Sequence, residues 1–412
     1  MRFYNIVKPV KPHFFFLFAV IIFSSCRKVN NNCMVEDYPD APQSGWFTSY
    51  GGSGEEAHGH FILTCSDGGY LQIGETGFIP NSAKLLVVKT NQSGSFQWSK
   101  EFSGGTGHNL GNSAFEGDDA YFICGSLNEN STIIKLNKSD GSIVFEKTHD
   151  NGGSDAFEHI SVTPDGIIAV GYVQAEDNLN TFYTEGQGYL TFLDADGNKT
   201  NGINLENNMA HAYRIKNLGS DFVVSGLTEG ANDYAVLKID ASGNMIWNKT
   251  FGGSNSDHCF AMDLSADGGV FLSGHTLSGT ENWDAYTMKI DTDGNQLWET
   301  KTGNPRGFDP KYIHDEVWGI KGTNDGGCII VAGTGDEYSN YKKRCGNNGD
   351  DSNTWHVYLV KYDGNGHVQW QKTYSDAESG DWAGEDIDLT ADGGAMVAVD
   401  NGSFGFLKIS PF

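Results

Sequence analysis

The sequence has few prolines and few basic residues, and it lacks the short motifs of several enzyme classes. Its 412 residues include 9 Pro, and 27 Lys and Arg stand against 53 Asp and Glu, so the formal net charge is −26. An acidic surface of this size repels phosphate backbones, which excludes nucleic acid as a partner. The sequence contains no HExxH, CxxC, phosphate-loop or nucleophile-elbow pattern. It therefore indicates no metal centre and leaves any catalytic residue unknown.

Long hydrophobic runs are also scarce. The one clear case, FFFLFAVIIF (14–23), is too short to span a bilayer and follows a basic N-terminal stretch, as in a signal peptide. With the SSC tripeptide (24–26) after it, the segment resembles the lipobox of bacterial lipoproteins, although Phe23 stands where Leu is usual. The resemblance implies a signal peptide at 1–25, a lipidated Cys26, and an envelope protein anchored at the outer membrane. An ordinary secretion signal is the alternative.

After this segment, residues 26–44 show no hydrophobic periodicity and are predicted to form a flexible tether. In residues 45–412, two short patterns alternate and recur about every 50 residues. One is Asp-Gly-Gly, an apolar run and Gly, as in DGGVFLSG (267–274). The other is Lys-x-Asp/Asn, then Gly and an aromatic residue, as in KIDTDGNQLW (289–298).

Each repeat contains four short apolar runs and no helical stripe. Seven such repeats predict an all-β fold, a seven-bladed β-propeller of four-stranded antiparallel blades. The seventh repeat stops at Phe412 before its fourth strand, whereas GWFTSYGG (45–52) matches the fourth-strand segment IWNKTFGG (246–253). We therefore expect the N-terminal strand to complete the last blade and close the ring.

The stretch IDTDGN (290–295) also looks like the start of a calcium loop. However, its Gly comes fourth rather than sixth, and no Glu follows at the twelfth position. Asn, Asp and Gly favour a tight turn, so we interpret the stretch as the hairpin between the third and fourth strands of a blade. Bound Ca²⁺ remains the alternative, and no other cofactor is expected.

Together, the patterns W-x-K-T-[YF]-G-G, D-G-G-[apolar]-x-x-G and K-[IL]-D-x-x-G resemble the tandem-repeat propellers of bacterial secreted lipoproteins. These proteins are distantly similar to quinoprotein propellers. The resemblance covers residues 45–412 and implies the fold, but it implies little about activity. A quinone cofactor is disfavoured because the chain has no adjacent cysteine pair and no clear calcium-binding set.

Candidate binding residues precede the Asp-Gly-Gly elements, in the segments that enter the innermost strands. Propellers usually bind ligands there, at the mouth of the central channel, and most of the 12 histidines fall in these segments. Such imidazoles and carboxylates could bind a metal, a cationic group or a sugar. Alternatively, they only support the strand ends, as Asp155, Asp257 and Asp315 would by capping turns. The candidates are His58, His60, His108, His159, His211, His258, His314, Glu316 and Glu385.

Two tryptophans outside the periodic pattern, Trp318 and Trp382, are candidate sugar platforms, and burial between blades is their alternative. Trp283 and Trp355 occupy matching positions before third strands and are predicted to be structural. Residues 335–355 form a polar insertion that either recognises a partner or is a solvated loop.

These features favour a non-catalytic, lipid-anchored propeller that binds a glycan or another envelope protein and touches the membrane only through its anchor. The alternative is a polysaccharide-degrading lyase or hydrolase with its site at the channel mouth.

Overall fold

The computed structural model describes residues 36, 38–54, 56–77, 83–105, 109–175, 186–231, 233–335, 354–376 and 381–412. All of them belong to one unit, Asn32–Phe412. The predicted signal peptide, Cys26, His108 and most of the predicted insertion lie outside the described residues.

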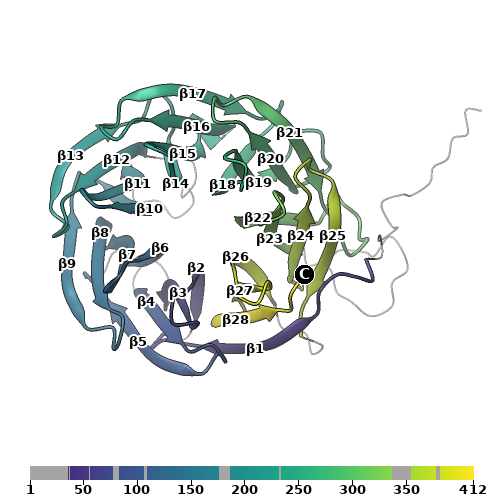
Figure 1. The fold of residues 1–412 in the computed structure, drawn as a ribbon, viewed down its shortest axis with the longest axis horizontal. Helices are drawn as coiled ribbons and strands as arrows, with labels where there is room; N and C mark the ends of the chain where they lie inside the picture. The colour runs from purple at the N-terminus through teal and green to yellow at the C-terminus, as the bar shows by residue number, and fades with distance from the viewer. Residues whose placement is uncertain are drawn as a thin grey trace, which may run out of the picture. The chain divides into compact units, whose positions relative to one another are not determined.

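Seven four-stranded antiparallel sheets surround a central axis, which confirms the predicted seven-bladed propeller (Figure 1). The first three blades, each from the inside outward, are β2 (Ala57–Thr64), β3 (Tyr70–Thr76), β4 (Lys84–Thr90) and β5 (Phe96–Phe102); β6 (Leu110–Glu116), β7 (Ala120–Leu127), β8 (Asn130–Asn137) and β9 (Ile143–His149); and β10 (Ser154–Thr163), β11 (Gly166–Ala175), β12 (Gln187–Leu193) and β13 (Lys199–Asn204).

The next three blades are β14 (His211–Leu218), β15 (Asp221–Leu227), β16 (Tyr234–Ile239) and β17 (Met245–Phe251); β18 (Asp257–Leu264), β19 (Val270–Thr276), β20 (Asp284–Ile290) and β21 (Gln296–Thr302); and β22 (His314–Gly322), β23 (Cys328–Gly335), β24 (His356–Tyr362) and β25 (Val368–Tyr374). A short 3-10 helix, η3 (Glu229–Ala231), lies between β15 and β16.

The seventh blade consists of β26 (Ala383–Leu389), β27 (Ala395–Asp400), β28 (Phe404–Ile409) and, outermost, β1 (Ser44–Tyr50). β1 pairs antiparallel with β28, and the Phe47 ring stacks on Trp382 at a centroid distance of 4.1 Å. The predicted closure by the N-terminal strand is therefore confirmed. The chain docks before residue 45: Ala41 is buried, and the Tyr374 hydroxyl donates to the Pro42 carbonyl at 2.8 Å.

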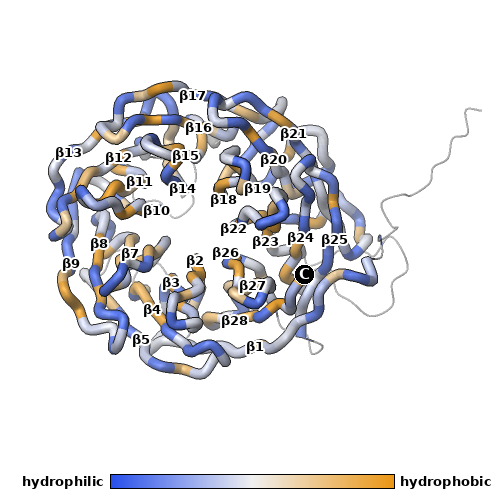
Figure 2. The backbone as a smooth tube through the Cα atoms, in the orientation of Figure 1, coloured by the Kyte–Doolittle hydropathy of each residue, from blue (hydrophilic) through white to orange (hydrophobic). Residues whose placement is uncertain are grey.

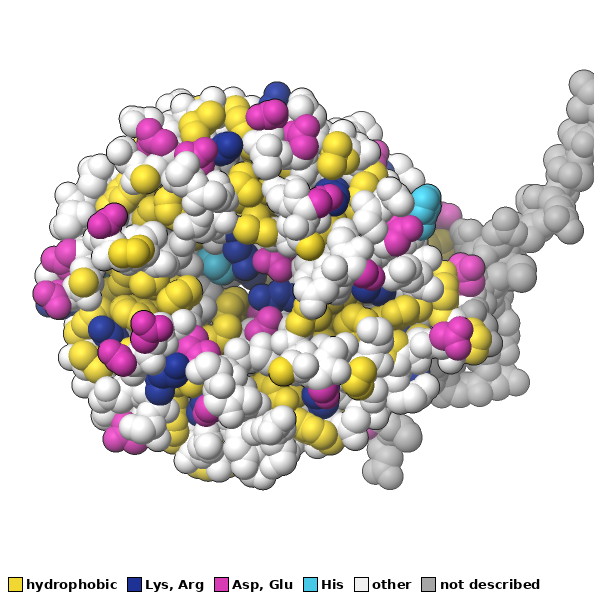
Figure 3. All heavy atoms as spheres, viewed as in Figure 1, with side chains coloured by type: hydrophobic (Ala, Val, Ile, Leu, Met, Phe, Trp, Pro, Cys, Tyr) yellow, Lys and Arg dark blue, Asp and Glu magenta, His cyan; other side chains and the backbone are white. Residues whose placement is uncertain are grey.

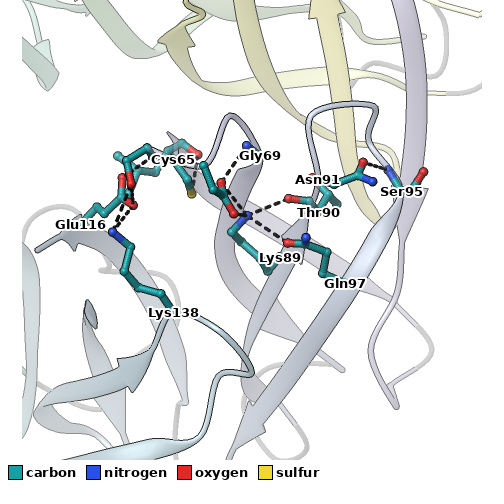
Figure 4. A network of polar contacts seen from close by, with 12 residues as sticks. Cys65, Gly69, Lys89, Thr90, Asn91, Ser95, Gln97, Glu116 and Lys138 are labelled. Carbon is teal, nitrogen blue, oxygen red and sulfur yellow. Dashed lines mark hydrogen bonds and ion pairs between the residues drawn. The ribbon is translucent and has the colours of Figure 1, made fainter. Parts of the chain in front are cut away.

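The repeated Asp-Gly-Gly and Lys residues form one recurring ion pair inside the blades. Asp67 accepts hydrogen bonds from the Gly69 N–H and from Lys89 Nζ, both at 2.8 Å. Lys89 is fully buried and also donates to Thr90 O and Gln97 Oε1 (Figure 4). A buried ammonium needs such partners, which explains why Lys and Asp recur together. The same contact joins Lys289 to Asp267, Lys361 to Asp325 and Lys408 to Asp392.

The stretch that resembles a calcium loop is the turn between β20 and β21. Asp291 Oδ1 accepts hydrogen bonds from the N–H groups of Asp293 and Asn295 at 2.9 and 2.8 Å. Gly294 has φ of 79°, a conformation that glycine adopts without strain. The acidic side chain thus caps the hairpin.

Hydrophobic residues recur in every blade rather than gathering in one core (Figure 2). Apolar side chains of neighbouring blades pack against each other, as Val331 of the sixth blade does with Ile387 and Val397 of the seventh. The four described cysteines, Cys65, Cys124, Cys259 and Cys328, are buried free thiols. Among the described residues, no helix is long and apolar enough to cross a membrane.

Candidate ligand-binding site

Every innermost strand contains a β-bulge at the same level of the channel, and each bulge skips one residue in the pairing with the next strand. Bulges re-aim side chains and recur beside functional sites. The skipped residues, here called the bulge ring, all line one cavity of about 170 Å³. They are His60, Asn112, Glu158, Tyr213, Phe260, Trp318 and Glu385.

The bulge ring has an aromatic wall and a polar wall. Tyr213, Phe260 and Trp318 come from three consecutive blades. The Phe260 ring meets Tyr213 edge-on at 4.9 Å and Trp318 at 4.6 Å between centroids. The remaining four members, from the seventh, first, second and third blades, carry carboxyl, imidazole or amide groups. Arg214 also lines this cavity.

A wider pocket of about 360 Å³, here called the mouth pocket, adjoins the bulge ring and shares Trp318 and Glu385 with it. Trp355 forms one side. Its ring lies on glycine backbone, since a Cβ added to Gly335 would stand 2.6 Å from the ring. The other lining residues are Glu56, His58, Glu316, Gly333, Asp381, Ala383, Asp400, Asn401 and Gly402.

Two imidazole–carboxylate pairs border these cavities on the first blade. His58 Nδ1 lies 2.7 Å from Asp400 Oδ2, and this hydrogen bond raises the pKa of His58 to about 9. His60 Nε2 lies 2.5 Å from Glu75 Oε2. Burial alone would lower the pKa of His60, but the charge and hydrogen bond of Glu75, together with the charges of Glu385 and Asp400, outweigh burial and raise this pKa to about 9. Both imidazoles are therefore cationic at neutral pH.

Two carboxyl groups of the bulge ring have the opposite tendency. Burial, followed by the charge of Asp400, raises the pKa of Glu385 to about 8. Burial raises the pKa of Glu158 to about 7, against the influence of Arg214 and His60. Oε1 of Glu158 has no hydrogen-bond partner among the described residues. A carboxyl group with a raised pKa and an open acceptor is suited to receive a ligand group.

On the sixth blade, His314 Nδ1 lies 3.1 Å from Glu316 Oε1. Burial would raise the pKa of Glu316, but the hydrogen bond from His314 and the nearby imidazoles lower it. Glu316 is thus a carboxylate at neutral pH, and it lines the mouth pocket together with His58.

The structure brings together seven of the residues predicted from sequence at the two adjoining cavities. His58, Glu316, Trp318 and Glu385 line the mouth pocket, and His60 lines the bulge ring with Trp318 and Glu385. His314 contacts Glu316, and His258 lies beside Trp283 at 4.6 Å and Phe260 at 5.8 Å between centroids.

Three predicted residues have other surroundings. His211 is buried, stacked on Tyr172 at 4.5 Å, with Nδ1 3.1 Å from the Tyr213 hydroxyl. His159 is buried next to Glu158, and burial holds its pKa well below the usual value. Trp382 does not line the mouth: it is 6% exposed and packs on Phe47, because the closing strand β1 covers it.

The structural role considered for the acidic residues before the innermost strands fits their contacts. Asp257 accepts from the Gly253 N–H at 2.6 Å and from Ser278 Oγ at 2.9 Å. Asp155 and Asp315 accept backbone N–H bonds from Asn151 and Asn304. These three side chains hold the loops that enter the blades.

Sequence reasoning missed several lining residues. The sequence predicts a structural role for Trp355, and no pattern in it points to Tyr213 or Phe260. Glu75 and Asp400 carried a usable signal: each directly follows the residue that ends an Asp-Gly-Gly element, Gly74 or Val399. This position faces the entry of the innermost strand, since Glu75 pairs with His58 and Asp400 with Ala383.

Ion pairs link innermost strands at the other end of the channel. Lys216 of β14 contacts Asp263 of β18 at 3.0 Å, and Lys321 of β22 contacts Asp388 of β26 at 3.2 Å. Asp388 also accepts the Thr64 N–H of β2 at 2.7 Å. Figure 3 shows basic and acidic side chains gathered around the central opening. These contacts satisfy charges between blades.

A larger hollow of about 610 Å³ lies on the loops between the fourth and fifth blades. Its walls are mostly polar loop residues, including Asp233, Asn255 and Glu281. The mouth pocket is the better candidate because it combines aromatic surface with several carboxylates. Within the described ranges, no three His, Cys, Asp or Glu side chains are grouped so as to hold a metal ion.

The fold and channel define a β-propeller. No protein-family model and no curated protein matches the chain. A solved structure of catalytically inactive virginiamycin B lyase from Staphylococcus aureus with quinupristin is 14% identical, with a TM-score of 0.56, covering 88% of this chain and 99% of that one.

The WD40 β-propeller domain of Doa1 is 11% identical, with a TM-score of 0.54 and coverages of 90% and 97%. Kuenenia stuttgartiensis hydrazine synthase is also 11% identical, with a TM-score of 0.54 and coverages of 85% and 94%. At these identities the similarity shows the fold alone.

Proposed function

We propose that this protein is a non-catalytic binding module whose ligand is a glycan held at the mouth of the central channel. The observation that supports this most directly is the mouth pocket, where Trp318 and Trp355 stand among the side chains of Glu316, Glu385 and Asp400. Sugar rings have apolar faces that pack on aromatic rings and hydroxyls that donate to carboxylates. The lining supplies both kinds of contact.

The charge of the site favours neutral or basic glycans over acidic ones. The protein carries a formal net charge of −26, and Glu56 and Asp381 line the pocket in addition to Asp400 and Glu316, which are paired with imidazoles. A polysaccharide carboxylate or sulfate would meet like charge during approach and again in the bound state.

The test is a thermal-shift screen with neutral and acidic oligosaccharides, followed by calorimetric titration of those that stabilise the protein. We expect neutral oligosaccharides to stabilise it, and Trp355→Ala to weaken their binding by about tenfold or more, as for loss of an aromatic contact in a binding site. Leu297→Ala, which removes an exposed apolar side chain from β21, is the matched control and should bind like the wild type.

Binding of acidic polysaccharides only, or equal affinity of Trp355→Ala and wild type, would contradict this assignment. If the partner is instead another protein, no oligosaccharide should stabilise this protein in the screen.

A degrading enzyme is the second candidate, and the carboxyl group of Glu385 supports it. With a pKa raised to about 8, Glu385 holds a proton at neutral pH, as a general acid for glycosidic cleavage must. Asp400 lines the same pocket and could act as the second carboxylate. Chromatography of oligosaccharides after prolonged incubation tests this. Products that vanish in Glu385→Gln would establish catalysis, whereas intact oligosaccharides favour the binding module.

The proposed location is the cell envelope, through a lipid on Cys26. The basic stretch, the apolar run and the SSC tripeptide at 24–26 support this. In a bacterial host fed an alkyne fatty acid, we expect the protein to be labelled and to sediment with membranes. Cys26→Ser should lose both properties, while Cys33→Ser should keep them. Labelled Cys26→Ser protein would contradict the lipid assignment.

A further inference from the structure

Within the bulge ring, the surroundings of Glu158 give the clearest indication of a bound ligand. It is 6% exposed, it lines the cavity, and its Oε1 has no hydrogen-bond partner among the described residues. An unpartnered buried carboxyl oxygen destabilises a protein unless a bound group compensates. The group that compensates here must be a hydrogen-bond donor or a cation.

The charged groups around Glu158 and Glu385 leave an excess of carboxyl groups. His60 and Arg214 face Glu158, and His58, His60, Asp400 and Glu316 face Glu385. Three histidines balance one carboxylate each: His58 with Asp400, His60 with Glu75, and His314 with Glu316. His58 also contacts Glu56, at 3.5 Å.

The other cations here are Arg214 and Lys321, and Lys321 is already paired with Asp388 at 3.2 Å. Arg214 therefore faces two carboxyl groups, Glu158 and Asp386. Asp386 already accepts the Ile62 N–H at 3.0 Å and feels the charge of Arg214. The single charge of Arg214 cannot balance both Glu158 and Asp386, and Glu385 faces only imidazoles that are already paired. Glu158 and Glu385 both belong to the polar wall of one cavity, which therefore has an excess of carboxyl groups.

The opposite wall suits the same kind of ligand. Tyr213, Phe260 and Trp318 present a continuous group of rings, with centroids 4.9 and 4.6 Å apart. Aromatic faces attract organic cations, and they do so more strongly when water is excluded. The volume of about 170 Å³ fits one small substituent, while the adjoining mouth pocket holds the rest of the ligand.

We propose that the bulge ring binds a protonated primary amine carried by the glycan, with the ammonium between the carboxyl groups of Glu158 and Glu385 and the aromatic wall. This inference rests on the proposed function and specifies its ligand as a sugar with a free amino group. The shared residues Trp318 and Glu385 place the two cavities in contact, so one sugar chain reaches both.

The test compares the glucosamine trisaccharide with its fully N-acetylated counterpart by calorimetry on the same protein. Acetylation removes the charge and keeps the sugar backbone. We expect the free amine to bind about tenfold tighter or more, as for a charge-assisted hydrogen bond. Glu158→Gln and Glu385→Gln should each abolish this preference. Glu146→Gln, an exposed change on β9, should preserve it.

A second readout does not depend on variants that fold. At a pH where the free amine already carries its proton, binding of the ammonium should release protons from the carboxyl groups, because it stabilises their ionised form. The binding enthalpy should then differ between buffers of different ionisation enthalpy. Equal affinity for the two trisaccharides would overturn the inference and leave glycan binding intact. If neither trisaccharide binds, both the amine inference and the proposed glycan binding fail. The two failures therefore give different results.

Discussion

At the scale of single residues, the recurring Lys–Asp pair is the contact that best explains the sequence. Lys289 is 3% exposed, and its Nζ lies 2.7 Å from Asp267 Oδ2. A lysine placed inside a blade is stable only with such a partner. The pair also fixes the Asp-Gly-Gly turn, because the Gly269 N–H donates to the same aspartate at 3.2 Å.

The pair should make the fold sensitive to acid. The hydrogen bond from Lys289 lowers the pKa of Asp267 from 3.8 to about 2, so its stabilisation is complete above about pH 4 and is lost as pH falls through about 2. Asp267→Asn should lose about 1 kcal/mol at pH 7, less than a fully buried pair would, because Asp267 is mostly exposed. Urea unfolding from pH 7 to pH 2 measures this.

The difference between Asp267→Asn and wild type should shrink as the pH falls from 4 to 2. The control is Asp293→Asn, in the neighbouring turn, where the exposed side chain takes part in no ion pair among the described residues. A difference between Asp267→Asn and wild type that stays constant across this range would contradict the proposed role of the ion pair.

At the scale of elements, β1 has the greatest consequence, because it completes the seventh blade. Phe47 stacks on Trp382, and Tyr50 packs edge-on against Phe406. Without β1, β28 would expose an unpaired edge and the blade would lose its outer packing. The strand pairs with β28, the last strand of the chain, so it joins segments from opposite ends of the described sequence.

We expect Phe47→Ala to lower the free energy of unfolding by about 2 kcal/mol, below the full cost for a buried phenylalanine because Phe47 is half-buried. Ser49→Ala, an exposed change on the same strand, should have little effect. Removing residues 1–50 should lower the melting temperature far more than removing residues 1–37, which ends before the docked segment. Equal melting temperatures of the two truncations would refute the closure role.

The elements also show what could be predicted from sequence. Turn chemistry is local, so Asp291 and Gly294 revealed a hairpin. The recurrence of this turn with the Asp-Gly-Gly pattern about every 50 residues revealed the blades. Three members of the bulge ring, His60, Trp318 and Glu385, were predicted candidates, but the ring itself was not predicted. Its members share a position in the innermost strand rather than a residue type. A bulge depends on pairing with the next strand, which periodicity does not show.

Sequence position indicates part of the candidate site, because the segments before the Asp-Gly-Gly elements enter the innermost strands. His58 and Glu316 were correctly expected to lie near the channel because they precede Asp-Gly-Gly elements. Trp382 lies at a similar distance from its Asp-Gly-Gly element, but the closing strand β1 covers it. That contact joins the two ends of the chain, so the local sequence does not show it. Trp355 was missed because its role depends on the glycine surface of β23 beneath its ring.

At the scale of the whole molecule, the two ends of the channel differ. The innermost strands begin around the mouth pocket, with tryptophans and unevenly balanced carboxyl groups. They end among matched ion pairs such as Lys321 with Asp388. Matched charges between blades stabilise a ring, whereas excess carboxyl groups beside aromatic surface favour a ligand. This asymmetry supports the mouth as the binding end.

The central claim is that a glycan binds at this end. Hydrogen–deuterium exchange with and without a saturating oligosaccharide that stabilises the protein tests it most directly. We predict slower exchange in peptides covering residues 56–60, 314–318, 354–358 and 381–385, with no change in the outer strands β5, β9 and β17. Protection confined to outer strands or to the hairpins at the opposite end of the channel would contradict the account.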